Sequence, residues 1–111
     1  MKKIGILCAG DAELEPFLPH IENGTVIRKA MLNCYDGEIC GVPVTALYSG
    51  VCKVNAAIAA QVLIDFFQVG AIINAGTAGG MDERLQVFDT VISIQAGYHD
   101  VAKGISDTVT T

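Results

Sequence analysis

Hydrophobic residues in this chain gather in short runs, and glycine or polar residues separate one run from the next. The first run spans residues 3–9 and stops at Gly10. A continuous apolar run of this length is typical of a strand that is covered on both faces. The order of runs along the chain predicts a largely parallel or mixed sheet. Further strands are expected at 25–32, 34–39, 42–48, 71–75 and 89–94.

A first helix is expected directly after Gly10, because apolar residues recur there at helical spacing. Acidic residues stand at the front of this segment, where negative charge complements the positive end of a helix. Pro19 is not suited to a helix interior, so the helix should be short or kinked. The apolar positions of this helix are Leu14, Phe17, Leu18 and Ile21.

Two turns are expected between the first helix and the middle of the chain. Glu22-Asn23-Gly24 has the composition of a turn, because asparagine and glycine tolerate backbone conformations that other residues avoid. Asp36-Gly37, within residues 35–38, is typical of a hairpin or tight bend.

A second helix is expected over residues 53–67, where several alanines and a leucine favour the helical state. Its apolar residues lie on nearly every side. A helix of this kind must be covered by something, so we expect it to pack between layers or against a partner subunit.

Composition predicts a globular protein of one domain, residues 1–111. Hydrophobic residues make up 51% of the chain and charged residues 17%, which is too apolar for disorder. The apolar runs are too short for a membrane span or for the core of a signal peptide. The net charge of −5 argues against a nucleic-acid partner, since phosphate binding needs clustered lysine and arginine. We expect a cytoplasmic protein with neither a nucleic-acid nor a membrane partner.

The cysteines and histidines predict neither a metal site nor a disulfide. Cys8, Cys34, Cys40 and Cys52 show no C-x-x-C spacing, and the two histidines lie far apart. Cys8 and Cys40 sit inside apolar runs, where a thiol usually behaves as a small hydrophobic group.

A glycine-rich turn follows the strand at 71–75 and is the strongest candidate for a ligand site. Gly76-Thr77-Ala78-Gly79-Gly80 offers bare backbone N–H groups and one hydroxyl at the carboxyl end of a strand. Open α/β sheets bind small molecules at that edge. The alternative is a tight turn without a ligand.

Several segments together resemble the N-terminal half of bacterial 5′-methylthioadenosine/S-adenosylhomocysteine nucleosidases. The resemblance implies an α/β fold of three layers, nucleoside-phosphorylase-like, with a central mixed sheet that is incomplete at the C-terminus. Residues 1–111 would then form the N-terminal part of one nucleosidase domain. The matching segments are Lys3-Ile4-Gly5-Ile6 with Ala9 and Glu13, residues 49–57, residues 74–80, Asp89-Thr90-Val91 and Tyr98-His99-Asp100.

The resemblance implies an enzyme that hydrolyses the N-glycosidic bond of methylthioadenosine and S-adenosylhomocysteine, yielding adenine and the 5-thioribose product for methionine salvage. It implies a homodimer, a nucleoside substrate and no cofactor. Such chemistry needs a general acid at the purine and a carboxylate that handles water and stabilises positive charge on the sugar. In the family's second half, a methionine-glutamate pair grips the ribose and an aspartate protonates adenine.

Glu13 matches the family's water-handling carboxylate, and Thr77 matches its hydroxyl residue near the ribose and the water. Ala78 and Gly79 would line the same wall, Val51 would pack against the 5′-alkylthio tail, and Ala9 would leave room for the water. From the residues alone, a helix N-terminal acid is the favoured interpretation of Glu13, Thr77 could be a turn residue, and Val51 could equally be part of the core. We expect Glu13 and Thr77 to face one cleft, about one water-bridged contact apart, on the order of 5–7 Å.

Three alternatives stay open. A related purine nucleoside phosphorylase would need arginines to hold phosphate, and Arg28 and Arg84 both lie outside the loop after the first strand. Water is therefore the better nucleophile.

The chain could also be a non-catalytic nucleoside-binding or dimerising module. Asp107, in Ile105-Ser106-Asp107, echoes the tripeptide around the family's purine-protonating aspartate; we interpret it as a chance match, and an internal deletion is the other explanation.

Overall fold

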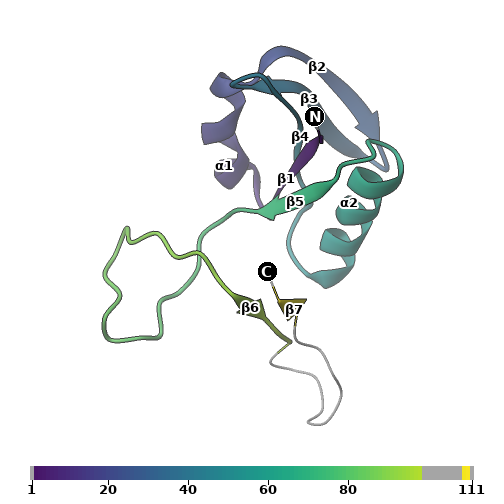
Figure 1. Ribbon diagram of the computed structural model, residues 1–111. Helices are drawn as coiled ribbons and strands as arrows, with labels where there is room; N and C mark the ends of the chain where they lie inside the picture. The colour runs from purple at the N-terminus through teal and green to yellow at the C-terminus, as the bar shows by residue number, and fades with distance from the viewer. Residues whose placement is uncertain (1, 99–108, 111) are drawn as a thin grey trace. The chain divides into compact units, whose positions relative to one another are not determined.

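The computed structural model describes residues 2–98 and 109–110 and divides the chain into two compact units, residues 1–78 and 79–111. The first unit contains a five-stranded sheet in the order β2-β3-β4-β1-β5 (Figure 1). Its central strand β1 (Ile4–Cys8) runs parallel to both β4 (Val42–Tyr48) and β5 (Ala71–Asn74). The hairpin strands β2 (Glu22–Lys29) and β3 (Leu32–Ile39) add antiparallel pairs. The predicted mixed sheet is confirmed.

Helices cover both faces of this sheet, which gives the three layers that were expected. On one face lie the single-turn helix α1 (Asp11–Leu14) and the 3₁₀ helix η1 (Glu15–His20), so the first helix is short, as its prolines predict. On the other face lies α2 (Lys53–Asp65). Successive residues of β1 point to opposite faces. Ile6 therefore packs on the α1 side, and Leu7 packs on the α2 side. The buried residues of the α1 cluster are Ile6, Cys8, Leu14 and Ala46, and those of the α2 cluster are Leu7, Cys34, Leu47, Ala59, Leu63 and Phe67.

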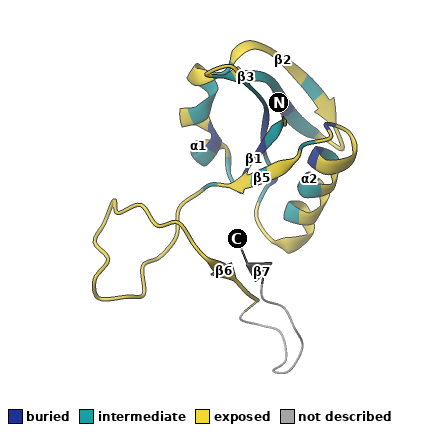
Figure 2. Cartoon of the chain, in the orientation of Figure 1, coloured by how far each residue is buried: buried dark blue, intermediate teal, exposed yellow. Residues whose placement is uncertain are grey.

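One side of α2 is buried against the sheet, and the other side is exposed (Figure 2). Ala59 and Leu63 have no exposed surface, whereas Val54, Ile58 and Ile64 are exposed. The helix ends two residues before its predicted end at Phe67. The described residues therefore cover one face of a helix whose sequence is apolar all round.

Both expected turns of the hairpin region are wrong. Residues 22–24 lie inside β2, where the pairing with β3 shifts between Glu22 and Thr25, and Asp36-Gly37 lies inside β3. Gly37 is needed for close approach, because a Cβ there would stand 2.7 Å from the carbonyl oxygen of Glu22. The real turns are at Ala30-Met31 and at Cys40-Gly41, and all four residues have positive φ.

The second unit contains one described pairing, between β6 (Gln95–Ala96) and β7 (Val109–Thr110). The strand expected over 89–94 is not formed. Within the described residues no strand pairs with this segment, and Val91, Ile92 and Ile94 are exposed. An apolar run becomes a strand only where a neighbouring strand takes its hydrogen bonds, and none does so here.

The helices that the structure describes are all too short or too polar to cross a bilayer.

Candidate active site at the ends of β1 and β5

The carboxylate of Glu13 is bound at the point where β1 and β5 end. Because α1 begins directly after β1, its third residue reaches back to the strand terminus. Oε1 accepts a hydrogen bond from the backbone N–H of Gly10 at 3.0 Å. Oε2 accepts two from Thr77, from the backbone N–H at 2.6 Å and from the hydroxyl at 3.0 Å. Glu13 and Thr77 thus meet as expected, but directly and without a bridging water.

Backbone hydrogen bonds fix these strand ends in register. The N–H of Ala75 donates to the carbonyl of Leu7 at 3.0 Å, which extends the β1–β5 pairing by one residue. On the other side of β1, the N–H of Ser49 donates to the carbonyl of Cys8 at 2.9 Å. The carboxyl ends of three parallel strands therefore share one edge, as in other ligand-binding α/β sheets.

The donors around Glu13 keep it ionised. The N–H of Thr77 lowers the pKa of the Glu13 carboxyl most, and the N–H of Gly10 and the Thr77 hydroxyl lower it further. Hydrogen bonds to the charged form favour it over the neutral acid. At neutral pH this side chain is an anion and an acceptor, and it carries no proton to donate.

Cys8 lies under this site at the end of β1 and is buried. Burial raises the pKa of the Cys8 thiol, and the negative charge of Glu13 raises it further. Cys8 therefore stays neutral and contributes packing to the α1 cluster, in agreement with its apolar sequence context. Cys40, by contrast, is exposed in a hairpin turn, so the expectation that its thiol behaves as a small hydrophobic group inside an apolar run is wrong.

A pocket opens beside these strand ends, under the start of α2. Among the residues that line it are Ala9, Ser49, Gly50, Lys53, Ala56 and Asn74. Ala9 therefore lines a pocket at this edge of the sheet, but neither Glu13 nor Thr77 is among the residues that line it. Val51 precedes α2, does not line this pocket and is 67% exposed, so the described residues do not bury it in the core. Ala78 and Gly79 are exposed in the turn after β5.

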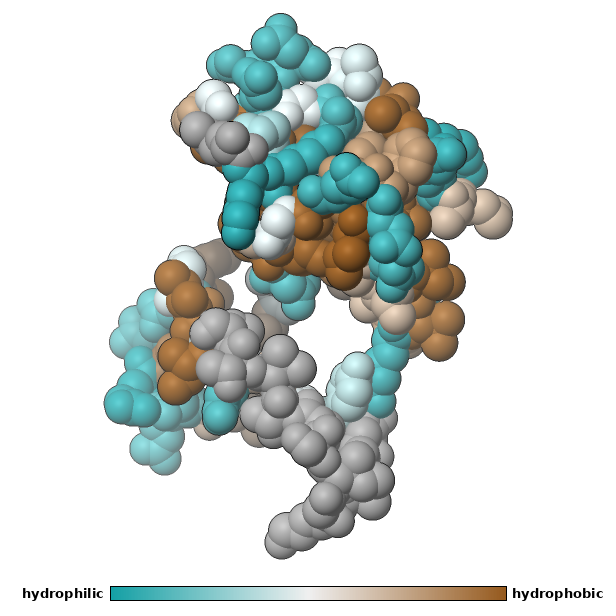
Figure 3. Space-filling view, turned by 45° about the vertical axis from the view of Figure 1, so that its right-hand side comes forward, coloured by the Kyte–Doolittle hydropathy of each residue, from teal (hydrophilic) through white to brown (hydrophobic). Residues whose placement is uncertain are grey.

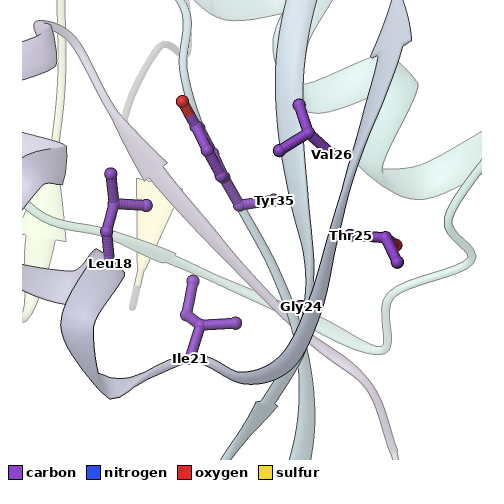
Figure 4. A pocket seen from close by; sticks show the side chains of 6 residues that line it. All are labelled: Leu18, Ile21, Gly24, Thr25, Val26 and Tyr35. Atoms are coloured by element: carbon purple, nitrogen blue, oxygen red, sulfur yellow. The ribbon is translucent and has the colours of Figure 1, made fainter.

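A second pocket lies between η1 and the β2–β3 hairpin, and no carboxylate, histidine, lysine or arginine is among the residues that line it (Figure 4). It is lined by Leu18, Ile21, Gly24, Thr25, Val26 and Tyr35. These side chains are mainly apolar with two hydroxyls, so the pocket offers no hydrolytic chemistry.

Sequence reasoning missed Gly10, whose N–H is a donor to the candidate catalytic carboxylate. A backbone donor has no residue signature beyond the glycine that ends the strand. Within the described residues no group of three or more histidine, cysteine, aspartate or glutamate side chains could hold a metal ion. His99, Asp100 and Asp107 lie outside the described residues.

Comparisons with known proteins agree with this architecture. The phosphorylase superfamily matches residues 3–107. The 5′-methylthioadenosine/S-adenosylhomocysteine nucleosidase of Halalkalibacterium halodurans is 45% identical over 101 residues, which are 91% of this chain and 44% of that protein. The nucleosidase of the same name from Colwellia psychrerythraea, solved with adenine, is 36% identical with a TM-score of 0.89, over 92% of this chain and 42% of that one. The Neisseria meningitidis nucleosidase, solved with methylthio-immucillin-A, is 33% identical with a TM-score of 0.89. The match covers 93% of this chain and 45% of that one.

These relatives confirm both the resemblance and the three-layer α/β fold. The chain spans less than half the length of each of these three relatives, 44% in the case of the Halalkalibacterium halodurans protein. The TM-scores of 0.89 show that the chain shares its fold with the matched part of the two solved structures. By sequence and by fold, the chain belongs to the phosphorylase superfamily.

Proposed function

We propose that this chain carries the water-handling part of a nucleosidase that hydrolyses the N-glycosidic bond of 5′-methylthioadenosine and S-adenosylhomocysteine. The observation that supports this proposal is the ionised Glu13 carboxylate, held by Gly10 and Thr77 where the strands end. The nucleosidases that the chain resembles also support it. The products would be adenine and the 5-thioribose, which enters methionine salvage.

Glu13 has the capacity to hold the attacking water. Gly10 and Thr77 donate three hydrogen bonds to its two oxygens, and the backbone N–H of Ala9 also lowers its pKa. The side chain stays partly exposed, and the attacking water would donate a hydrogen bond to it from that open side. As the N-glycosidic bond breaks, the water oxygen bonds to the anomeric carbon, its proton passes to Glu13, and the carboxylate's charge stabilises the cationic sugar. The electron pair of the broken bond leaves with adenine.

Adenine must take up a proton as it leaves. The residues that the resemblance assigns to this step, and to gripping the ribose, belong to the part of the relatives that this chain does not span. We propose that Ala9 leaves space for the water, that Thr77, Ala78 and Gly79 form the ribose wall, and that Val51 contacts the 5′-alkylthio group.

Water is a better nucleophile than phosphate at this site, because both arginines of the chain are engaged elsewhere. Arg84 donates two side-chain hydrogen bonds to Asp82, and Arg28 donates to the side chain of Asn33 at 3.2 Å. Asp11 and Glu13, which follow β1, would repel a phosphate anion. A phosphorylase would require cations at this position.

We also propose a cytoplasmic homodimer that forms through α2. Apolar side chains gather on the side of the first unit that comes forward in Figure 3, and α2 contributes exposed Val54, Ile58 and Ile64. Light scattering at low micromolar concentration should give dimers, and Ile58→Glu should give monomers. Met31→Glu, at an 84% exposed turn residue, is the matched control. A monomeric native chain would contradict this interface.

Adenine release from methylthioadenosine tests the function. Without an acid at the purine, the chain should turn over on the order of 10²–10⁴ times more slowly than the complete Halalkalibacterium halodurans enzyme. Glu13→Gln should abolish the remaining turnover, and a slow rate unchanged by Glu13→Gln would refute the catalytic assignment. Binding of methylthioadenosine without adenine release would favour the non-catalytic module. Robust turnover that Asp107→Asn abolishes would favour an internal deletion.

A further inference from the structure

Gly76 lies directly against the carboxylate of Glu13. A Cβ placed on Gly76 would stand 2.5 Å from Oε2 of Glu13 and 3.1 Å from its Cδ. Carbon and oxygen atoms that are not bonded do not approach to 2.5 Å, so a side chain here and the present carboxylate position exclude each other. The missing side chain of Gly76 is what leaves room for Glu13 to reach Thr77.

We propose that Gly76 is a positioning residue for the water-handling carboxylate, because it leaves open the volume from which Glu13 accepts both hydrogen bonds of Thr77. The role in catalysis rests on the proposed function, but the effect on Glu13 does not. Glycine is required for the space it leaves and for no special backbone angle, since the φ of Gly76 lies outside the left-handed region.

A Cβ at Gly76 would meet a movable side chain, whereas a Cβ at Gly37 would meet the backbone. A Cβ on Gly37 would collide with a backbone carbonyl, which cannot move without shifting a strand. A Cβ on Gly76 would collide with the end of a long and partly exposed side chain, which can rotate away. Gly76→Ala should therefore preserve the fold and displace the Glu13 carboxylate.

Displacement would remove the donors that hold Glu13 ionised. The backbone N–H and the hydroxyl of Thr77 would lose their acceptor, while the N–H of Gly10, on the opposite oxygen, could remain. The pKa of Glu13 would then rise toward the ordinary value of a glutamate, and the water-binding site on the carboxylate would move.

The test is a pH titration of the 111-residue chain, labelled with ¹³C at the glutamate side chains and followed by NMR, with thermal unfolding as a check on folding. Glu13→Gln assigns the Glu13 resonance. Gly76→Ala should raise the Glu13 pKa and keep a cooperative unfolding transition. Gly10→Ala is the matched control, because its Cβ would lie at an ordinary 3.7 Å from Oε1 and its backbone is extended; it should leave the Glu13 titration low.

An unchanged Glu13 pKa in Gly76→Ala would overturn the proposal, and so would loss of the folded state, which would make the glycine a structural requirement. Adenine release separates this inference from the proposed function. If Gly76→Ala shifts the titration and reduces turnover as far as Glu13→Gln does, both stand. If the titration shifts but no variant releases adenine, the positioning role stands and the proposed function fails.

Discussion

The backbone N–H and the hydroxyl of Thr77 both donate hydrogen bonds to the same oxygen of Glu13, Oε2, although the two residues lie 64 positions apart in the sequence. This contact joins the helix that follows β1 to the turn that follows β5. It gives the carboxylate a fixed position, and it keeps the charge on the acid. Each of these consequences can be measured separately from turnover.

Replacing the Thr77 hydroxyl should raise the Glu13 pKa only partly. The backbone N–H of Thr77 lowers this pKa more than its hydroxyl does, and Thr77→Val removes the hydroxyl alone. The Glu13 pKa should therefore rise in Thr77→Val yet stay below the ordinary glutamate range. Thr77→Ser retains an O–H donor and should titrate like the native chain. ¹³C NMR titration measures both, and a native Glu13 pKa in Thr77→Val would mean that the hydroxyl bond is not formed in solution.

The same contact predicts that Glu13 stabilises the fold at neutral pH and loses this effect in acid. Because the folded state lowers the Glu13 pKa, the folded chain binds this proton less readily than the unfolded chain. The stabilisation is complete above the unfolded glutamate pKa of about 4.3. It declines as pH falls through the lower folded pKa.

Urea unfolding of the native chain and of Glu13→Gln, between neutral and acidic pH, tests this linkage. The difference in unfolding free energy should be largest at neutral pH and should shrink on acidification. Glu15→Gln, at an exposed residue of η1, is the control for the loss of a surface carboxylate next to α1. A Glu13→Gln difference that grows toward acid pH would contradict the sign of the shift.

Sequence patterns located β1 and β4, whose apolar runs report burial on both faces. They also located β5, although its residues are mostly exposed in the described structure. They failed where one residue type serves two purposes. Asp36-Gly37 has the composition of a turn, but Gly37 provides close approach to Glu22 inside a strand. The real turn at Ala30-Met31 carries neither glycine nor asparagine, so nothing in its composition indicates positive φ.

In the candidate site, too, part of the arrangement could be predicted from the sequence and part could not. Glu13 and Thr77 could be predicted because the resemblance assigns them roles at strand ends. Their direct contact could not, since it depends on the backbone N–H of Gly10 and on the empty volume above Gly76. The segment 89–94 has a strand's composition but no neighbouring strand within the described residues, and a composition cannot reveal whether a partner is present.

Substitutions in the turn at Ala30-Met31 should raise the free energy of unfolding. Both residues have left-handed φ values, 48° and 64°, at a cost of roughly 1–2 kcal/mol each. Ala30→Asn with Met31→Gly supplies the residues that a two-residue hairpin turn prefers, and should raise the unfolding free energy by about 1 kcal/mol or more. Urea denaturation measures the gain.

Gly41→Ala is the complementary variant. Gly41 has φ of 81° and nothing within 4 Å of an added Cβ, so the loss it causes reports backbone strain alone. That variant should destabilise the fold by roughly 1–2 kcal/mol. If Gly41→Ala is neutral, or if the Asn-Gly turn destabilises the chain, the left-handed geometry of these turns is not the limiting factor.

The four cysteines should divide into two pairs by reactivity. Cys8 and Cys34 are buried, and burial raises the pKa of both thiols, so little of the reactive thiolate is present. Cys40 and Cys52 are exposed. Brief treatment of the folded chain with iodoacetamide at mildly alkaline pH, followed by peptide mass mapping, should modify Cys40 and Cys52 first.

In denaturant all four cysteines should react at similar rates, which controls for intrinsic differences in thiol reactivity. Modification of Cys8 as fast as that of Cys52 in the folded chain would show that the end of β1 is open to solvent, and would contradict the packing of Leu14 and Cys8 in the α1 cluster.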